Sequence, residues 1–275
     1  MTSRMCMKMY FPGFRRKALT FSYDDGVLQD RRLIDIFKSH RMKATFNLNS
    51  GLLGRHYMHR GVDHSHFEPN EIKEVYGGYE VAGHSLTHPD LTALTDSELI
   101  CELGEDKTAL ERLCGRDVVG FAYPGGKYND RVTNMLGRLG FKYARVVEES
   151  ENFELPECLL RWKGTCRHTN PRLFELAERF LEEQREEPML FCLWGHSYEF
   201  DMHGDWERME KFCEMTADRE DIWYAENGET ADYISAYRGL VFEENRIYNP
   251  SDTDIYLNYS GRKILLRGRE YMCLN

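Results

Sequence analysis

The sequence lacks a long apolar run. Residues 1–17 carry positive charges without a continuous apolar stretch, and no later segment approaches the roughly 20 apolar residues of a membrane span. We therefore predict a cytoplasmic protein without a membrane partner.

An excess of positive charge is also missing. The chain has 36 Lys and Arg against 46 Asp and Glu, a net charge of -10, and its basic residues are scattered. Nucleic acid is therefore not an expected partner. The eight cysteines show no CxxC spacing, and 275 residues can bury a core that needs no disulfides, so we expect reduced thiols.

Short β-rich runs alternate with helical patterns along most of the chain. This alternation predicts a parallel sheet, and about seven such units close into a (β/α) barrel more readily than they lie flat. An open doubly wound sheet is the alternative. The runs are residues 17–23, 43–49, 79–83, 118–124, 142–147, 189–194 and 221–225.

The pattern changes after about residue 240 to β-rich segments without a helix, with Ser260 and Gly261 at a plausible hairpin turn. We therefore predict a barrel domain over residues 1–240 and a small β-rich extension over residues 241–275.

The segment from Gly54 to Glu80 has little periodicity and is rich in histidine. We expect a long surface loop near the functional site. Its individual histidines are expected to be solvated: His56, His59, His64 and His66.

Two adjacent carboxylates, Asp24 and Asp25, end the first predicted strand. The carboxyl ends of strands are where α/β proteins place their sites. Consecutive side chains diverge, so one carboxylate can bind a cation while the other stays beside a water molecule bound to that cation. An Asp-Asp-Gly turn that caps the next helix is the alternative.

Two histidines, His84 and His88, follow the third predicted strand. Their four-residue separation lets both imidazoles face one point if the segment makes a helical turn. Together with Asp25 they would form a site with two imidazoles and one carboxylate. Such a site suits zinc for hydrolysis or ferrous iron for oxygen chemistry.

A further histidine, His196, ends the sixth predicted strand two residues after Trp194. Charged, it would donate a proton to a leaving group while Asp24 accepts one from water, and each step contributes ~10²–10⁴-fold to hydrolysis. A structural or metal-binding histidine is the alternative.

The fourth predicted strand ends in Tyr123, Pro124 and Gly125. The glycine lets a substrate approach the main chain, where a backbone N–H of Tyr123 or Gly125 would hold an oxyanion. A plain strand-to-helix turn is equally compatible.

In their order and spacing these motifs resemble the polysaccharide deacetylases of carbohydrate esterase family four, also called the NodB-homology domain, over about residues 17–200. TFSYDDG is similar to the family's Thr-Phe-Asp-Asp-Gly motif with Ser22 and Tyr23 added, and HSLTH fits its His-Ser/Thr-x-x-His motif. The resemblance implies a distorted seven-stranded (β/α) barrel that removes acetyl groups from a sugar, as N-acetyl amides or O-acetyl esters. It implies one divalent cation, zinc before cobalt, nickel or iron. The implied roles are Asp24 as general base, Asp25, His84 and His88 as metal ligands, and His196 as general acid.

Two family motifs are altered here. Ala122 stands where the third motif has an arginine, and Arg161 stands before Trp162 where the fourth has an acidic residue that, with its tryptophan, orients the catalytic histidine. We hypothesise that Arg161 lies beside Asp24 in place of the absent arginine. Glu199 or Asp201 would polarise His196, and Trp194 would line a sugar-binding face.

Other functions remain open on the sequence. A related hydrolase of small non-sugar amides would use the same triad. A glycan- or metal-binding protein without turnover is motivated by the missing arginine, and an iron-dependent oxygenase by the ligand set.

Overall fold

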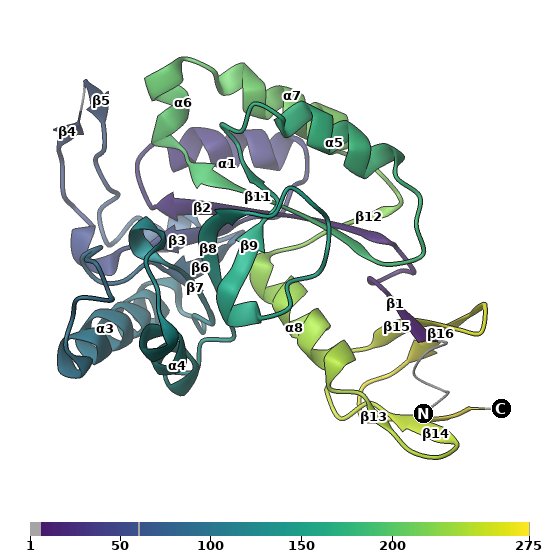
Figure 1. Cartoon of the computed structure of the whole chain (residues 1–275). Helices are drawn as coiled ribbons and strands as arrows, with labels where there is room; N and C mark the ends of the chain where they lie inside the picture. The colour runs from purple at the N-terminus through teal and green to yellow at the C-terminus, as the bar shows by residue number, and fades with distance from the viewer. Residues whose placement is uncertain (1–6, 60, 275) are drawn as a thin grey trace.

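The computed structural model describes residues 7–59 and 61–274 and shows an α/β fold built on a nearly closed barrel of parallel strands (Figure 1). The predicted barrel is confirmed. Within the described residues its sheet has nine strands, in the order β10-β11-β2-β3-β6-β7-β8-β9, with β12 paired to β2. These strands are β2 (Lys17–Asp25), β3 (Thr45–Leu48), β6 (Glu80–Gly83), β7 (Gly120–Ala122), β8 (Tyr143–Glu149), β9 (Trp162–Gly164), β10 (Cys166–Arg167), β11 (Met189–His196) and β12 (Ile222–Tyr224).

Helices connect the strands and cover the outside of the barrel. The longest starts at Thr95, whose side chain and that of Glu98 form a reciprocal capping box, and ends at Gly115 in the left-handed conformation (φ +70°). The α-helices are α1 (Asp30–Ser39), α2 (Ile72–Val75), α3 (Asp96–Cys114), α4 (Asp130–Arg138), α5 (Leu173–Glu182), α6 (Tyr198–His203), α7 (Trp206–Thr216) and α8 (Asn227–Arg238). The 3₁₀ turns are η2 (Ser50–Leu52), η3 (Pro124–Gly126) and η4 (Leu159–Arg161).

Alternation along β2 separates the outer core from the barrel interior. Phe21 packs against Phe37 of α1 and Phe212 of α7 in the outer core. The neighbouring residues face the other way, since successive side chains of a strand point to opposite faces. Ala18 belongs to a second apolar cluster that includes residues of α8. This alternation leaves Ser22 and Asp24 on the inner face, at the carboxyl end of the barrel.

The segments after residue 240 form two small antiparallel sheets. β1 (Met7–Tyr10) joins one of them by pairing with β15, so a strand from the start of the chain completes a sheet from its end. The predicted hairpin turn lies between β15 and β16, with positive φ at Ser260 and Gly261. The strands are β13 (Val241–Phe242), β14 (Arg246–Tyr248), β15 (Ile255–Tyr259), β16 (Arg262–Leu266) and β17 (Tyr271–Cys273). The division at residue 240 stays a prediction.

The segment between β3 and β6 contains the hairpin of β4 (Met58–His59) and β5 (Val62–Asp63), drawn at the left of Figure 1. The expectation that all its histidines are solvated is wrong for His64 and His66, which are buried. His64 packs its ring 4.0 Å from that of Tyr198.

No helix in residues 7–59 and 61–274 combines the length and the apolar character needed to cross a membrane. The described cysteines are all unpaired, as expected for reduced thiols: Cys101, Cys114, Cys158, Cys166, Cys192, Cys213 and Cys273.

Candidate metal and catalytic site

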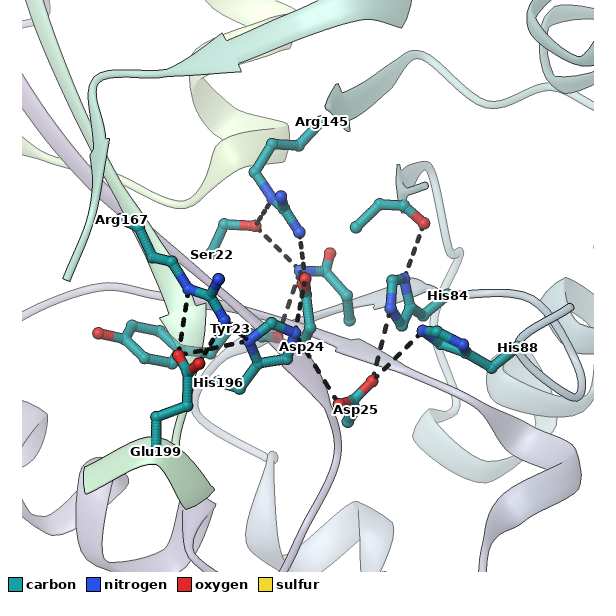
Figure 2. A network of polar contacts seen from close by, with 12 residues as sticks. Ser22, Tyr23, Asp24, Asp25, His84, His88, Arg145, Arg167, His196 and Glu199 are labelled. Atoms are coloured by element: carbon teal, nitrogen blue, oxygen red, sulfur yellow. Dashed lines mark hydrogen bonds and ion pairs between the residues drawn. The ribbon is translucent and has the colours of Figure 1, made fainter. Parts of the chain in front are cut away.

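The predicted site residues converge at the carboxyl end of the barrel (Figure 2). Asp24 and Asp25 end β2, His84 follows β6, and His196 ends β11. β11 and β2 are hydrogen-bonded neighbours, with His196 in register with Asp24. Three separate strands therefore deliver their polar ends to one place.

Asp25, His84 and His88 form a cluster with metal-ligand chemistry. One side-chain donor atom from each lies within 4.8 Å of the others, and Asp25 Oδ1 is 3.5 Å from His84 Nε2 and 3.9 Å from His88 Nε2. Two imidazole nitrogens and one carboxylate oxygen are a ligand set that zinc and related divalent cations accept. These three residues therefore fit one divalent cation.

The orientation of His84 is fixed by a hydrogen bond. Its Nδ1 lies 2.8 Å from the carbonyl oxygen of Ala122, which requires the proton on Nδ1 and leaves Nε2 free to face Asp25. Burial lowers the pKa of His84 to about 4 against the opposing charges of Asp24 and Asp25. The ring is therefore neutral and ready to act as a ligand.

The turn that carries the two histidines is not helical, yet both imidazoles face Asp25. Ser85 and His88 adopt positive φ angles (+65° and +62°), as does Asp25 (+80°). Such backbone is costly for residues with a side chain and persists where the surroundings hold it. Here the Asn49 amide donates to the carbonyl of Ser85 at 2.8 Å, and Asp106 accepts from the backbone N–H of His84 at 3.2 Å.

Gly26 allows the tight exit of the chain from β2. Its φ is +69°, and a Cβ placed there would lie 2.6 Å from Leu48 Cδ2. A larger residue would therefore displace the Asp24 and Asp25 pair.

Asp24 is buried and fully engaged. Arg145 donates a hydrogen bond to its Oδ2, and Asn47 donates to its Oδ1 at 2.8 Å. Burial would raise the pKa of this carboxyl, but the nearby charges of Arg145 and His196 hold it well below its usual range. Asp24 is therefore ionised and available as a base.

His196 faces both aspartates across the site. Its Nε2 lies 3.8 Å from Asp24 Oδ2 and 3.9 Å from Asp25 Oδ2, and its Nδ1 lies 3.0 Å from Arg167 Nη2 and 3.5 Å from Glu199 Oε2. Burial lowers the pKa of His196, but the Glu199 hydrogen bond and the aspartate charges outweigh it and raise the pKa above its ordinary value. Protonated His196 suits proton donation.

A pocket of about 400 Å³ opens beside these residues. Trp194 forms part of its wall, and the guanidinium groups of Arg145 and Arg167 lie over its ring at 4.5 and 5.2 Å from the centroid. The pocket is lined by Asp24, His84, Tyr123, Gly125, Val147, Glu149, Arg167, Trp194 and His196.

The comparisons with known proteins agree with this geometry. Residues 13–144 match the family model described as polysaccharide deacetylase. This region, just under half of the chain, is similar to the polysaccharide deacetylase family. A chitooligosaccharide deacetylase of Rhizobium leguminosarum bv. trifolii is 30% identical over 124 residues, which cover 44% of this chain and 52% of the relative.

Other relatives extend the comparison with this deacetylase family. Chitin deacetylase 1 of Cryptococcus neoformans var. grubii is 30% identical over 122 residues, covering 43% of this chain and 23% of that protein. The chain thus spans about half the length, or less, of the first curated relatives it matches. A Mycobacterium smegmatis structure assigned to the polysaccharide deacetylases shares the fold, with a TM-score of 0.62 at 18% identity over 86% of this chain and 98% of that one.

The deacetylase motif hypothesis for Arg161 is wrong. Its guanidinium pairs with Asp130 and lies over the ring of Tyr128, on the exposed side of η4 and α4. The arginine at Asp24 is Arg145, from β8. Arg161 ends the half-buried turn η4, whereas Arg145 lies in the buried part of β8.

Of the other residues predicted to orient His196, one lies beside it and two do not. Glu199 lies beside His196, whereas Asp201 accepts hydrogen bonds from Trp206 Nε1 (2.8 Å) and Gln29 Nε2 (3.0 Å). Trp162 packs its ring 5.8 Å from that of Tyr143 in the second apolar cluster, so its predicted role beside His196 is wrong.

Only one of the residues predicted to hold an oxyanion remains a candidate. The backbone N–H of Tyr123 donates to Arg145 O at 3.0 Å and is therefore used by the sheet. Pro124 has no N–H. Gly125 lines the pocket with a positive φ of +56°, so its N–H remains the predicted donor to the oxyanion.

Three residues that the sequence reasoning missed complete the site: Asn47, Arg145 and Arg167. Arg145 had a signal, because a lone arginine inside the apolar run KYARVV must be paired when that strand is buried. Arg167 and Asn47 had none, since their neighbours in space are far away in sequence.

Proposed function

We propose that the chain is a metal-dependent hydrolase that removes acetyl groups, N-acetyl and also O-acetyl, from a sugar or oligosaccharide. One observation carries this proposal. The cluster of Asp25, His84 and His88 lies beside an ionised, buried Asp24, and His196 faces both aspartates from the other side. The similarity of residues 13–144 to the polysaccharide deacetylase family supports the substrate class.

The residues divide the work of hydrolysis. A divalent cation, which we propose to be zinc, would when bound supply Lewis acidity that polarises the acetyl carbonyl and acidifies water. Asp24 takes the proton of the attacking water, because its carboxylate is ionised and held in place by Arg145 and Asn47. The Gly125 N–H would hold the developing oxyanion.

His196 completes the reaction as proton donor. Its protonated Nε2 faces the aspartates, where it can protonate the leaving amine or hydroxyl as the bond to the acetyl carbon breaks. The products are acetate and the free amino sugar or hydroxyl. Trp194 gives the pocket wall an aromatic face, but it is almost fully buried and both guanidinium groups contact its ring.

The test is acetate release from acetylated sugars and oligosaccharides by the protein loaded with zinc, cobalt, nickel or iron. Asp24→Asn is expected to keep the metal and lose turnover by at least about 10²-fold, because the base is lost. His84→Ala is expected to lose both, because a ligand is removed. Metal content is measured by mass analysis, with one cation per chain expected. Normal acetate release from either variant would sink the assignment.

Substrate class is decided by the same assay. Small cyclic and linear amides are added to the panel, because a related amide hydrolase would use the same residues. Release from the amides without release from any acetylated sugar would favour that second function. A cytoplasmic location remains a further proposal, to be checked by cell fractionation of the tagged protein.

A further inference from the structure

The arginine that contacts Asp24 comes from an unexpected strand. The sequence has Ala122 at the family's arginine position on β7, and the structure supplies Arg145 from β8 instead. Ala122 and Arg145 are partners in the register of these two parallel strands. Partners in a ladder project to the same face and lie on strands about 4.8 Å apart. The two positions are therefore adjacent in one layer of the barrel interior.

Arg145 is held on every side. It is 1% exposed, its Nε donates to Ser22 Oγ at 3.2 Å, and its Nη1 donates to Val146 O at 3.2 Å. Its guanidinium also stacks 4.5 Å from the ring of Trp194. Only Asp24 balances its charge among the contacts recorded for the described residues. Figure 2 shows the guanidinium directed at Asp24, with Ser22 beside it.

These contacts also fix the carboxylate. Arg145 engages Oδ2 of Asp24, Asn47 engages Oδ1, and Ser22 Oγ accepts from both Arg145 and Asn47 (2.9 Å). A carboxylate held at both oxygens cannot rotate, so the lone pairs that remain to take a proton have fixed directions.

We propose that Arg145 is the positioning residue of Asp24, and that this function has moved one strand around the barrel, from position 122 to position 145, within the same layer. The proposal rests on the proposed function, in which Asp24 is the base. It predicts that an arginine returned to position 122 can replace the one at 145. The space is available only when position 145 is emptied, because Ala122 is fully buried.

The experiment compares Arg145→Ala with the double variant Arg145→Ala/Ala122→Arg, which has the same composition as the natural protein. Arg145→Ala is expected to lower kcat by about 10²-fold and to change KM less than threefold. Asp24 loses its orientation in this variant, whereas the substrate keeps its contacts. The double variant is expected to recover at least tenfold of the loss. Arg145→Lys is expected to have a lower kcat than the double variant, because an ammonium group lacks the planar fork of a guanidinium.

Arg161→Ala is the matched control. It removes an arginine of the same neighbourhood in sequence whose partner is the exposed Asp130, and turnover is expected to stay within twofold. A loss in this variant equal to that of Arg145→Ala would overturn the proposal.

Folding is measured for each variant by thermal unfolding of the metal-free protein, because Arg145→Ala leaves a buried carboxylate unpaired. If that variant does not fold, Arg145→Ala/Asp24→Asn removes both charges and is expected to fold. A double variant with arginine at 122 that melts like the natural protein but recovers no turnover would overturn the positioning role. So would Arg145→Ala with unchanged kcat.

The two proposals fail differently. Absence of acetate release by the natural protein with every metal and substrate refutes the proposed function. The move of the arginine from position 122 to position 145 is then still tested by thermal unfolding. Adding Ala122→Arg to Arg145→Ala must restore the lost melting temperature. Adding it to Arg145→Ala/Asp24→Asn must not raise the melting temperature. Restoration in both backgrounds overturns it.

Discussion

His196 has two different neighbours at its Nδ1 atom. Arg167 can only donate to this nitrogen, and Glu199 can only accept from it. The neutral ring with its proton on Nε2 accepts from Arg167, whereas the charged ring donates to Glu199. Arg167 and Glu199 also bond to each other, and a charged ring that gives up its Nε2 proton keeps the Nδ1 proton, and with it the bond to Glu199, within this network.

The first residue-scale prediction concerns Glu199→Gln. Glu199 raises the pKa of His196, and its own pKa is about 2, lowered by His196 and Arg167 against the effect of burial. Removing this charge lowers the pKa of His196, so the proton donor is lost at a lower pH. We expect the alkaline limb of the kcat/KM profile to move to lower pH and kcat to fall about tenfold.

Asp201→Asn is the control for this pH profile, because Asp201 bonds Trp206 and Gln29. Its profile should match that of the natural protein. An unmoved alkaline limb in Glu199→Gln would remove Glu199 from the acid side of the site.

At the residue scale the sequence predicted which side chains meet but not what surrounds them. Asp24, Asp25, His84, His88 and His196 each end or follow a strand, and parallel strands bring their carboxyl ends to one edge. Arg145 reaches Asp24 across the barrel, 121 positions away in the chain. No local pattern encodes a contact of that kind, which is why Arg161 was chosen wrongly from a short motif.

At the element scale, a buried carboxyl joins three helices. Asp30 begins α1, and it accepts hydrogen bonds from Tyr76 Oη (2.7 Å), just after α2, and from Ser197 Oγ (2.6 Å), just before α6. Ser197 also follows His196 directly. Asp30 is fully buried, and burial raises its pKa to about 7.

This pKa predicts a stability change with pH. Below about pH 4 the carboxyl is protonated in the folded and the unfolded chain. Between about pH 4 and 7 only the unfolded chain ionises, so rising pH favours unfolding, and above about pH 7 the difference is constant. Three pKa units at about 1.36 kcal/mol each correspond to about 4 kcal/mol.

We therefore expect the free energy of unfolding of the natural protein to fall by up to about 4 kcal/mol between pH 4 and 8 because of Asp30. Asp30→Asn is expected not to show this decrease. Urea unfolding of the metal-free variant and natural protein across this range measures it. Asp35→Asn, on the exposed face of the same helix, is the control. Parallel stability curves for Asp30→Asn and the natural protein would contradict the assignment of a protonated Asp30.

The seven predicted strands all exist, because each is a compact β-branched or aromatic run bounded by turn residues. β9 and β10 escaped prediction, since they have three and two residues with only Thr165 between them, too few for an alternating pattern. The burial of His64 and His66 escaped as well. It depends on Tyr57 and Tyr198, whose rings cover them only in the folded chain.

At the scale of the whole molecule, the two ends of the described chain depend on each other. Met7 and Met9 of β1 are buried in the same cluster as Ile255 and Leu257 of β15. That cluster also contains α8 residues such as Tyr233, which donates to Tyr10 O at 2.6 Å. The strands after residue 240 therefore cover apolar surface that the barrel alone would expose.

A chain that ends at residue 240 is expected to melt at a lower temperature and to aggregate, because β1 loses every strand partner in the described structure. Thermal unfolding and gel filtration measure this. A chain that ends at residue 270 removes only β17 and is the control, with a smaller change expected. A chain ending at 240 that melts like the natural protein would show that the barrel is self-sufficient.

The pairing of β1 with β15 also orders events during synthesis. Residues 7–10 leave the ribosome long before residues 255–259, with which they pair. Until then the two methionines of β1 have no strand beside them, and the barrel must form while this apolar cluster is incomplete. The closing step therefore waits until β15 has been made, and a pause in translation before that strand would lengthen the time that this surface is open to chaperones.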